Sequence, residues 1–264
     1  MGPVGRRAVV AALAAVSLAA SACSRAAPAA VHHLAPGHAV HRRRAPAARA
    51  STTTSTTTTV ATTTTTTLAP TTTTLAPLRT NPAGALPQTD TAAGPIPSAA
   101  TAQFHTEMDD LWQGILTDSL PTAIWAFFPE AAYDQLKAIA DPDADWRDRL
   151  VAEFAEDLAA AHDYVMASPD GRDARLLYVA VDTAEVAWIP PGYCYNSIGY
   201  WHAPGVRLVY EQDGATRSIG IASLISWRGQ WYVVHLGAVL RPGPGGFVDA
   251  PSPGQGQFAP AGGC

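Results

Sequence analysis

Acid–base chemistry requires a histidine or a carboxylate in a pocket, together with a second polar group that orients it. In this chain of 264 residues the candidates are His235, which lies among apolar residues of an expected strand, and the carboxylates of Asp182 and Glu211. Together such groups could abstract and return a proton. A histidine in an apolar strand is more often a hydrogen-bonded core residue, and no sequence neighbour supplies its partner. Both interpretations of His235 therefore stay open.

A second group of residues could bind a ligand without transforming it. Aromatic side chains are concentrated in and around the expected sheet, and Tyr193, Tyr195 and Trp201 are the ones we expect to line a cavity or a partner surface. Ring faces stack on sugars or on apolar ligands, and Arg207 could orient a polar group. The remaining aromatic residues are expected to pack in the core, because strands favour them there.

The chain contains three cysteines, Cys23, Cys194 and Cys264. If Cys23 is modified, the two that remain most simply pair in an oxidising compartment, and we expect a disulfide between Cys194 and Cys264. Closing a loop of about 70 residues would stabilise the fold by roughly 4 kcal/mol. The alternative is that Cys194 is a buried thiol. No Cys-x-x-Cys, zinc-ligand spacing or phosphate-binding glycine loop occurs in the expected domain, so we expect neither a metal nor a cofactor.

The first 23 residues have the pattern of an export signal. Arg6 and Arg7 precede an apolar run from Ala8 to Ala20, and small residues lead to Cys23. This ending resembles a bacterial lipobox, in which Cys23 would be lipidated, although Ala20 stands where that motif usually carries Leu. We therefore expect an exported protein anchored by lipid on the outer side of the cell membrane. Cleavage by an ordinary signal peptidase, which would release a secreted protein, is the alternative.

Residues 24–100 are rich in Thr, Pro and Ala, and they show no apolar periodicity. Such a sequence cannot build a core, so a disordered stalk is expected. Its composition resembles the O-glycosylated stalks of secreted bacterial proteins. Residues 1–100 carry eight basic side chains and one acidic, whereas residues 101–264 carry nine basic and 21 acidic. This asymmetry suits a basic tail beside an anionic membrane, and it argues against nucleic-acid binding by the folded part.

Residues 101–242 are long enough for one domain. Apolar residues recur at helical spacing from Phe104 to Leu116, and further helices are expected after Pro129 and after Asp141, the latter ending near Ser168. Strands are expected at 175–188, 195–202, 206–211, 216–227 and 230–240, with tight turns at 213–214 and 228–229. Helices followed by an antiparallel meander define an α+β domain. Residues 243–264 are expected to be a Gly- and Pro-rich tail.

The order of these elements, with the tryptophan-rich final pair Ser226-Trp227-Arg228-Gly229-Gln230-Trp231-Tyr232-Val233-Val234-His235, is similar to the cone-shaped nuclear transport factor two-like fold. That resemblance implies N-terminal helices packed on a curved antiparallel sheet that leaves a cavity. Members of the superfamily include isomerases, dehydratases, polyketide cyclases and non-catalytic binding domains, so the fold alone does not define a function. The layout also resembles small exported lipoproteins of the actinobacterial type, whose roles are accessory or unknown.

The sequence therefore predicts a non-catalytic binding or assembly module at the cell envelope. The expected partners are the membrane, through a lipid anchor, and an envelope protein, a glycan or a small apolar ligand; no nucleic acid is expected. The alternative is a small isomerase- or dehydratase-like enzyme that uses a cone-shaped cavity.

Overall fold

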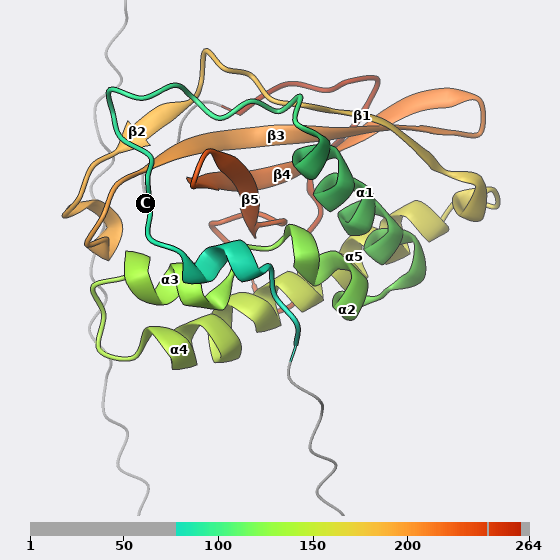
Figure 1. The fold of residues 1–264 in the computed structure, drawn as a ribbon. Helices are drawn as coiled ribbons and strands as arrows, with labels where there is room; N and C mark the ends of the chain where they lie inside the picture. Colours follow the sequence, from blue (N-terminus) through green and yellow to red (C-terminus); the bar gives the residue numbers. More distant parts are fainter. Residues whose placement is uncertain (1–77, 242, 260–264) are drawn as a thin grey trace, which may run out of the picture. The chain divides into compact units, whose positions relative to one another are not determined.

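The computed structural model describes residues 78–241 and 243–259 (Figure 1). The expected signal peptide, the lipidation site Cys23, most of the expected stalk and Cys264 lie outside the described residues. The predictions made for them stay predictions.

The first helices begin and end where local signals predict. Helix α1 (Ala102–Thr117) is capped by Thr101, whose hydroxyl accepts a hydrogen bond from the Phe104 amide at 3.1 Å. It ends at Asp118, which adopts a left-handed conformation with φ of 50°. The short helix α2 (Leu120–Ala123) then starts with proline in its first turn and runs into the 3₁₀ turn η2 (Ile124–Ala126).

Two further helical segments lie side by side. Helix α3 (Glu130–Leu136) is followed by α4 (Pro142–Asp145), which continues through the π-helical turn η3 (Trp146–Leu150) into α5 (Val151–Met166). Asp141 caps this long element by accepting a hydrogen bond from the Ala144 amide at 3.0 Å. The 3₁₀ turn η4 (Gly171–Asp173) leads into the sheet.

All pairings within the six-stranded sheet are antiparallel. The strands are β1 (Arg175–Ala180), β2 (Ala187–Ile189), β3 (Tyr200–Gln212), β4 (Ala215–Trp227), β5 (Gln230–His235) and β6 (Asp249–Pro253). The main order is β1-β3-β4-β5, with β2 also paired to β3 and β6 also paired to β4. The predicted α+β class is therefore confirmed.

Both predicted hairpin turns are present, because Asp213 and Arg228 adopt φ of 55° and 54° and a glycine follows each. The expected strand boundaries differ in three places. The strand expected at 230–240 ends at His235, the last residue of β5. The strand expected at 175–188 is interrupted by a turn in which the Asp182 side chain accepts a hydrogen bond from the Ala184 amide. Residues 195–199 do not belong to a strand, and the two expected strands at 195–202 and 206–211 are one continuous strand, β3.

The core lies between the helices and one face of the sheet (Figure 1). Aromatic pairs connect the two layers: the rings of Trp112 and Tyr210 have centroids 5.0 Å apart, and those of Phe128 and Trp227 are 5.8 Å apart. Among the described residues, no helix is long and apolar enough to span a bilayer.

The domain begins before the expected boundary, because residues 78–100 pack on it. Gly84 lies so close to Pro129 that an added Cβ would be 2.4 Å from the proline Cβ. The indole N–H groups of Trp227 and Trp231 donate hydrogen bonds to the carbonyls of Leu86 and Pro97. The expectation that the stalk extends to residue 100 is thus wrong for its last part. Backbone carbonyls hold this segment, and composition does not reveal such contacts.

The expected C-terminal tail is also part of the domain, at least to residue 259. Strand β6 pairs with β4, and the buried guanidinium group of Arg207 donates hydrogen bonds to the carbonyls of Ala250 and Gln255, at 2.7 and 3.2 Å. Arg207 also donates to the Ser218 hydroxyl at 2.8 Å. A buried arginine of the sheet therefore holds a segment whose Gly and Pro content predicted a tail.

Candidate functional site

A cavity of about 590 Å³ opens between the helices α3 and η3 and the strands β2 to β5. This volume lies within the range of roughly 300–1,000 Å³ that is usual for small-molecule sites. The residues that line the cavity are Tyr133, Leu136, Lys137, Arg149, Leu150, Ile189, Cys194, Tyr195, Tyr200, His202, Pro204, Gly205, Ala222, Ser223, Ile225, Val234, His235, Ala238, Val239, Leu240, Asp249 and Ala259. Most of them are apolar, so the wall suits an apolar ligand.

A short turn, η5 (Tyr193–Tyr195), forms part of the cavity rim. Two backbone hydrogen bonds fix it to the end of α3: the Ala138 amide donates to the Tyr195 carbonyl at 2.7 Å, and the Ser197 amide donates to the Leu136 carbonyl at 2.8 Å. Lys137 lies between these bonds. Its backbone is extended, because it is the residue at which α3 ends.

Lys137 is the only lysine of the chain. Its ammonium group donates a hydrogen bond to the Cys194 carbonyl at 2.9 Å and lies 5.9 Å from the centre of the Tyr133 ring. No ion pair joins it to a carboxylate of the described residues. Burial lowers the pKa of Lys137, and the neighbouring charge of Arg149 lowers it further.

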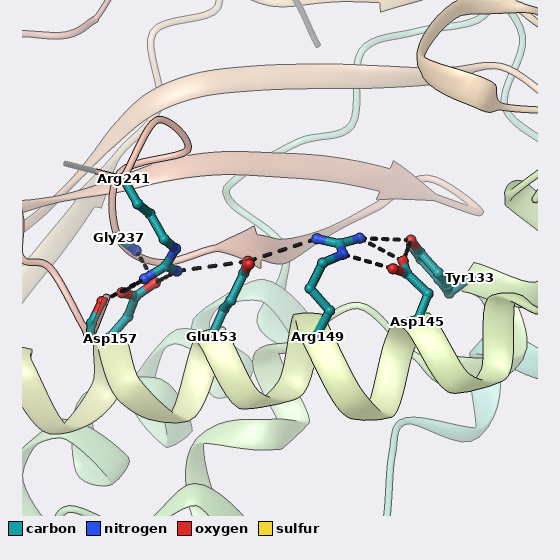
Figure 2. Close-up of polar contacts among 8 residues, drawn as sticks. Tyr133, Asp145, Arg149, Glu153, Asp157, Gly237 and Arg241 are labelled. Carbon is teal, nitrogen blue, oxygen red and sulfur yellow. Dashed lines mark hydrogen bonds and ion pairs between the residues drawn. The ribbon is translucent and has the colours of Figure 1, made fainter. Parts of the chain in front are cut away.

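Arg149 also lines the cavity, but its charge is compensated (Figure 2). It donates two hydrogen bonds to Asp145, from Nε at 2.7 Å and from Nη2 at 2.5 Å, and Tyr133 donates its hydroxyl proton to the same carboxylate. These contacts, and first of all the hydrogen bonds from Arg149, lower the pKa of Asp145. Arg149 is thus held in place by an acid, whereas Lys137 is not.

The charged row continues along the same helical element (Figure 2). Glu153 lies 3.8 Å from both Arg149 and Arg241, and Asp157 accepts two hydrogen bonds from Arg241 at 2.9 and 2.8 Å. Asp157 also accepts the backbone amides of Gly237 and Phe247. This row therefore fixes the segment after β5, which supplies Ala238 to Leu240 to the cavity wall.

Two histidines lie on the sheet side of the cavity. His202 Nε2 is 2.8 Å from the Ser223 hydroxyl, and His235 is the partner of Ser223 in the β4–β5 register. Burial lowers the pKa of both histidines to about 4, so both are neutral near neutral pH. For His235 the positive charges of Arg149, Arg241 and Lys137 lower the pKa further. The cavity is therefore a place that disfavours additional positive charge.

The structure does not bring the predicted acid–base residues together. His235 lines the cavity, but Asp182 and Glu211 do not. Asp182 caps the turn after β1, and Glu211 lies 3.6 Å from Arg175 in an exposed ion pair. The pairing of His235 with either carboxylate, which the enzymatic alternative required, is absent from this arrangement.

Of the four residues expected to bind a ligand, Tyr195 lines the cavity, with 78% of its surface exposed at the rim. Tyr193 is also exposed but does not line it, and Trp201 packs edge-on against Trp188. Arg207 holds the C-terminal segment instead. The expectation that Arg207 orients a ligand is therefore corrected, because its guanidinium group binds the C-terminal segment. Tyr193 and Trp201 do not line the cavity, and their expected role in a partner surface stays a prediction.

Cys194 lies in the cavity wall and is disulfide-bonded. Neither of the other two cysteines is among the described residues, so its pairing with Cys264 stays a prediction. Within the described ranges, no group of three or more His, Cys, Asp or Glu side chains is arranged to hold a metal ion.

The sequence analysis did not single out Lys137, Arg149 or His202, all of which line the cavity. One signal was visible in the sequence, because a single lysine in a chain with 17 basic residues is unusual. Its position at the cavity follows only from the contact between α3 and η5.

The chain matches no known protein family, and neither a curated protein nor a solved structure is significantly similar to it.

Proposed function

We propose that this protein is a non-catalytic binding module of the cell envelope, and that its cavity holds a small apolar ligand. The cavity of about 590 Å³ is the observation that supports the proposal. Its wall contains Leu136, Leu150, Ile189 and Ile225, and transfer of an apolar group from water into such a wall is favourable by about 25 cal/mol per Å².

The proposal includes a cone-like arrangement of the domain. Helices cover one face of the sheet (Figure 1). Residues of α3, η3 and the strands line the cavity, which agrees with the cavity that the resemblance to the nuclear transport factor two-like fold implies. In such an arrangement the helices close one side of the sheet incompletely. The space that remains is available for a ligand.

The groups in the cavity favour binding over acid–base catalysis. Among the described residues, the only acidic one in the wall is Asp249, whose carboxyl group lies against Gly220 and near Arg207. Burial, and then the charges of Arg149 and Arg241, lower the pKa of His235 and so disfavour its protonated form. A histidine that resists protonation and lacks a carboxylate partner is a poor proton shuttle.

The location is proposed from the sequence. The charged, apolar and small-residue segments before Cys23 favour export, and the cysteine at their end favours lipid attachment. A single acyl chain binds a membrane weakly, and the basic residues Arg42, Arg43 and Arg44 could add an electrostatic contact. The cavity would then lie on the outer side of the membrane.

Titration of the full chain with Nile red, an uncharged apolar dye, tests the proposed binding. We expect saturable fluorescence enhancement that is lost in Val234→Trp, because Val234 lies in the cavity wall and the larger ring would occupy the space. Leu177→Trp adds the same ring on β1, outside the cavity, and should bind like the natural protein. Equal dye binding by the two variants, or no saturable binding by the natural protein, would contradict the proposal.

A further inference from the structure

We propose that the cavity is selective for an anionic amphiphile, whose acidic head group binds Lys137 while its alkyl chain lies along the apolar wall. The inference rests on the proposed function and adds the chemical class of the ligand. It starts from an imbalance of charge in the wall of a mostly apolar cavity.

The imbalance lies at the contact between α3 and η5. Arg149 and Asp145 compensate each other through two short hydrogen bonds, and Glu153 lies on the other side of Arg149. Lys137 has as its polar partners a backbone carbonyl and the face of an aromatic ring, neither of which carries a full negative charge. The charge of Asp145, which Arg149 already binds, favours the charged form of Lys137, but it offsets the effects of burial and of Arg149 on the pKa of Lys137 only in part. A positive charge without an ion-pair partner among the described residues therefore remains in the cavity wall.

An ammonium group has three donors, and the hydrogen bond to the Cys194 carbonyl uses one of them. A ligand carboxylate beside the ammonium group would accept a hydrogen bond from a second N–H of Lys137. Its negative charge would balance the positive charge of the lysine. Charge-assisted hydrogen bonds are roughly twice as strong as neutral ones, and partial burial strengthens them further. A second cation would be repelled here, because Lys137 and Arg149 are both positively charged. In addition to burial, their charges lower the pKa of His235.

The opposite part of the ligand is also constrained. Leu150, Ile225 and Val234 belong to the apolar part of the wall, and their side chains offer no hydrogen bond to a polar chain. The neutral histidines beside Ser223 add polarity without charge. A ligand with one acidic end and one apolar chain matches this arrangement, whereas a sugar would leave most of its hydroxyl groups unpaired.

Calorimetric titration of the full chain with decanoate, decan-1-ol and acetate tests the inference. Decanoate should bind more tightly than the alcohol, and acetate should bind far more weakly than either because it has no chain. In Lys137→Met the affinity for decanoate should fall about 10- to 100-fold, the loss expected for a hydrogen bond to a charged group. The affinity for the alcohol should change little.

Two further variants serve as controls. Lys137→Arg keeps the charge and should retain most of the preference for decanoate over the alcohol. Arg147→Met removes an exposed cation of η3 that does not line the cavity, and it should bind both compounds like the natural protein. Thermal unfolding of each variant shows whether the fold is kept.

The outcomes separate the two proposals. If the alcohol and decanoate bind equally, or if Lys137→Met keeps the preference, the anionic class is wrong while the apolar cavity stands. If acetate binds as tightly as decanoate, the site takes a small anion and not an amphiphile. If neither long-chain compound binds, the proposed function itself fails.

Discussion

Asp157 accepts two hydrogen bonds from the guanidinium group of Arg241, at 2.9 and 2.8 Å, although the two residues are 84 positions apart in the sequence. Asp157 is 1% exposed and also accepts the amides of Gly237 and Phe247. One carboxylate of α5 thus holds both sides of the segment that follows β5. That segment forms part of the cavity wall.

Removal of this carboxylate should destabilise the whole domain. In Asp157→Ala a buried amide, a partly buried amide and an arginine lose their acceptor, so we expect the free energy of unfolding to fall by about 3 kcal/mol. Asp163→Ala changes an exposed aspartate of the same helix and should alter stability by less than about 0.5 kcal/mol. Urea unfolding of the three proteins measures both values; similar midpoints for all three would show that the carboxylate does not hold the segment.

The contact of residues 78–100 with the sheet can be tested at Gln88. Its side chain donates to the Ser226 carbonyl at 3.1 Å and accepts the Arg228 amide at 2.7 Å. Gln88→Ala should therefore lower the free energy of unfolding by about 1–2 kcal/mol. Thr89→Ala, one position further on an exposed side chain, should have no measurable effect. If Gln88→Ala is as stable as the control, the segment does not belong to the cooperative unit.

Glu107 should make the fold less stable as the pH rises. Burial is the main reason that its pKa rises from 4.5 to about 7, and hydrogen bonds from Gln103 and Asn81 oppose this only partly. Between these two pH values the folded state binds more protons than the unfolded state, so the free energy of unfolding falls through this range and then levels off.

Replacement by glutamine isolates this contribution. Glu107→Gln should unfold with a free energy up to about 3 kcal/mol higher than the natural protein near pH 8, and the difference should vanish near pH 4. His202 and His235, whose protonation destabilises the fold below their ordinary pKa, affect both proteins equally and cancel in the difference. The matched variant Asp109→Asn removes an exposed carboxylate of the same helix and controls for the loss of one negative charge. A difference that does not vary with pH would contradict the assignment.

Since Lys137 is the only lysine, its ionisation can be followed directly. Reductive methylation with an isotope label gives one lysine signal in a nuclear magnetic resonance spectrum, besides that of the chain's amino terminus. We expect the pKa of this group to be lower in the folded protein than in the urea-unfolded chain, because burial and Arg149 both disfavour its charge. Decanoate should raise it again. Equal values in the folded and unfolded chain would contradict the environment described for Lys137.

The elements that could be predicted from sequence depend on local signals. Thr101 and Asp141 cap helices through neighbouring amides, and Asp213-Gly214 and Arg228-Gly229 are local turn signals of the kind that predict hairpins. These signals predicted the helices, strand β4 and the turns on either side of it, and with them the α+β class.

The features that could not be predicted depend on contacts between distant segments. The ordered ends at 78–100 and 243–259 are held partly by apolar residues that pack on the core, such as Ile96 and Val248, and partly by hydrogen bonds to the sheet and its turns, such as those of Arg207. Residues of α3, η3, η5 and the strands line the cavity, and these elements are far apart in the sequence. No periodic pattern in the sequence therefore indicated that Lys137 lies in the cavity wall. His235 could be identified because a lone histidine in an apolar strand is visible in the sequence. The charged residues that share the cavity with it, Lys137 and Arg149, could not be identified in this way.

Native mass spectrometry of the full chain, purified from its own envelope without denaturation, tests the binding function most directly. We expect an additional mass of a few hundred daltons that is lost on unfolding, that behaves as an acid with an alkyl chain, and that is missing from Val234→Trp. If the natural protein and this variant carry no mass beyond that of the unfolded chain, the cavity does not hold a ligand in the cell, and the proposed function is wrong.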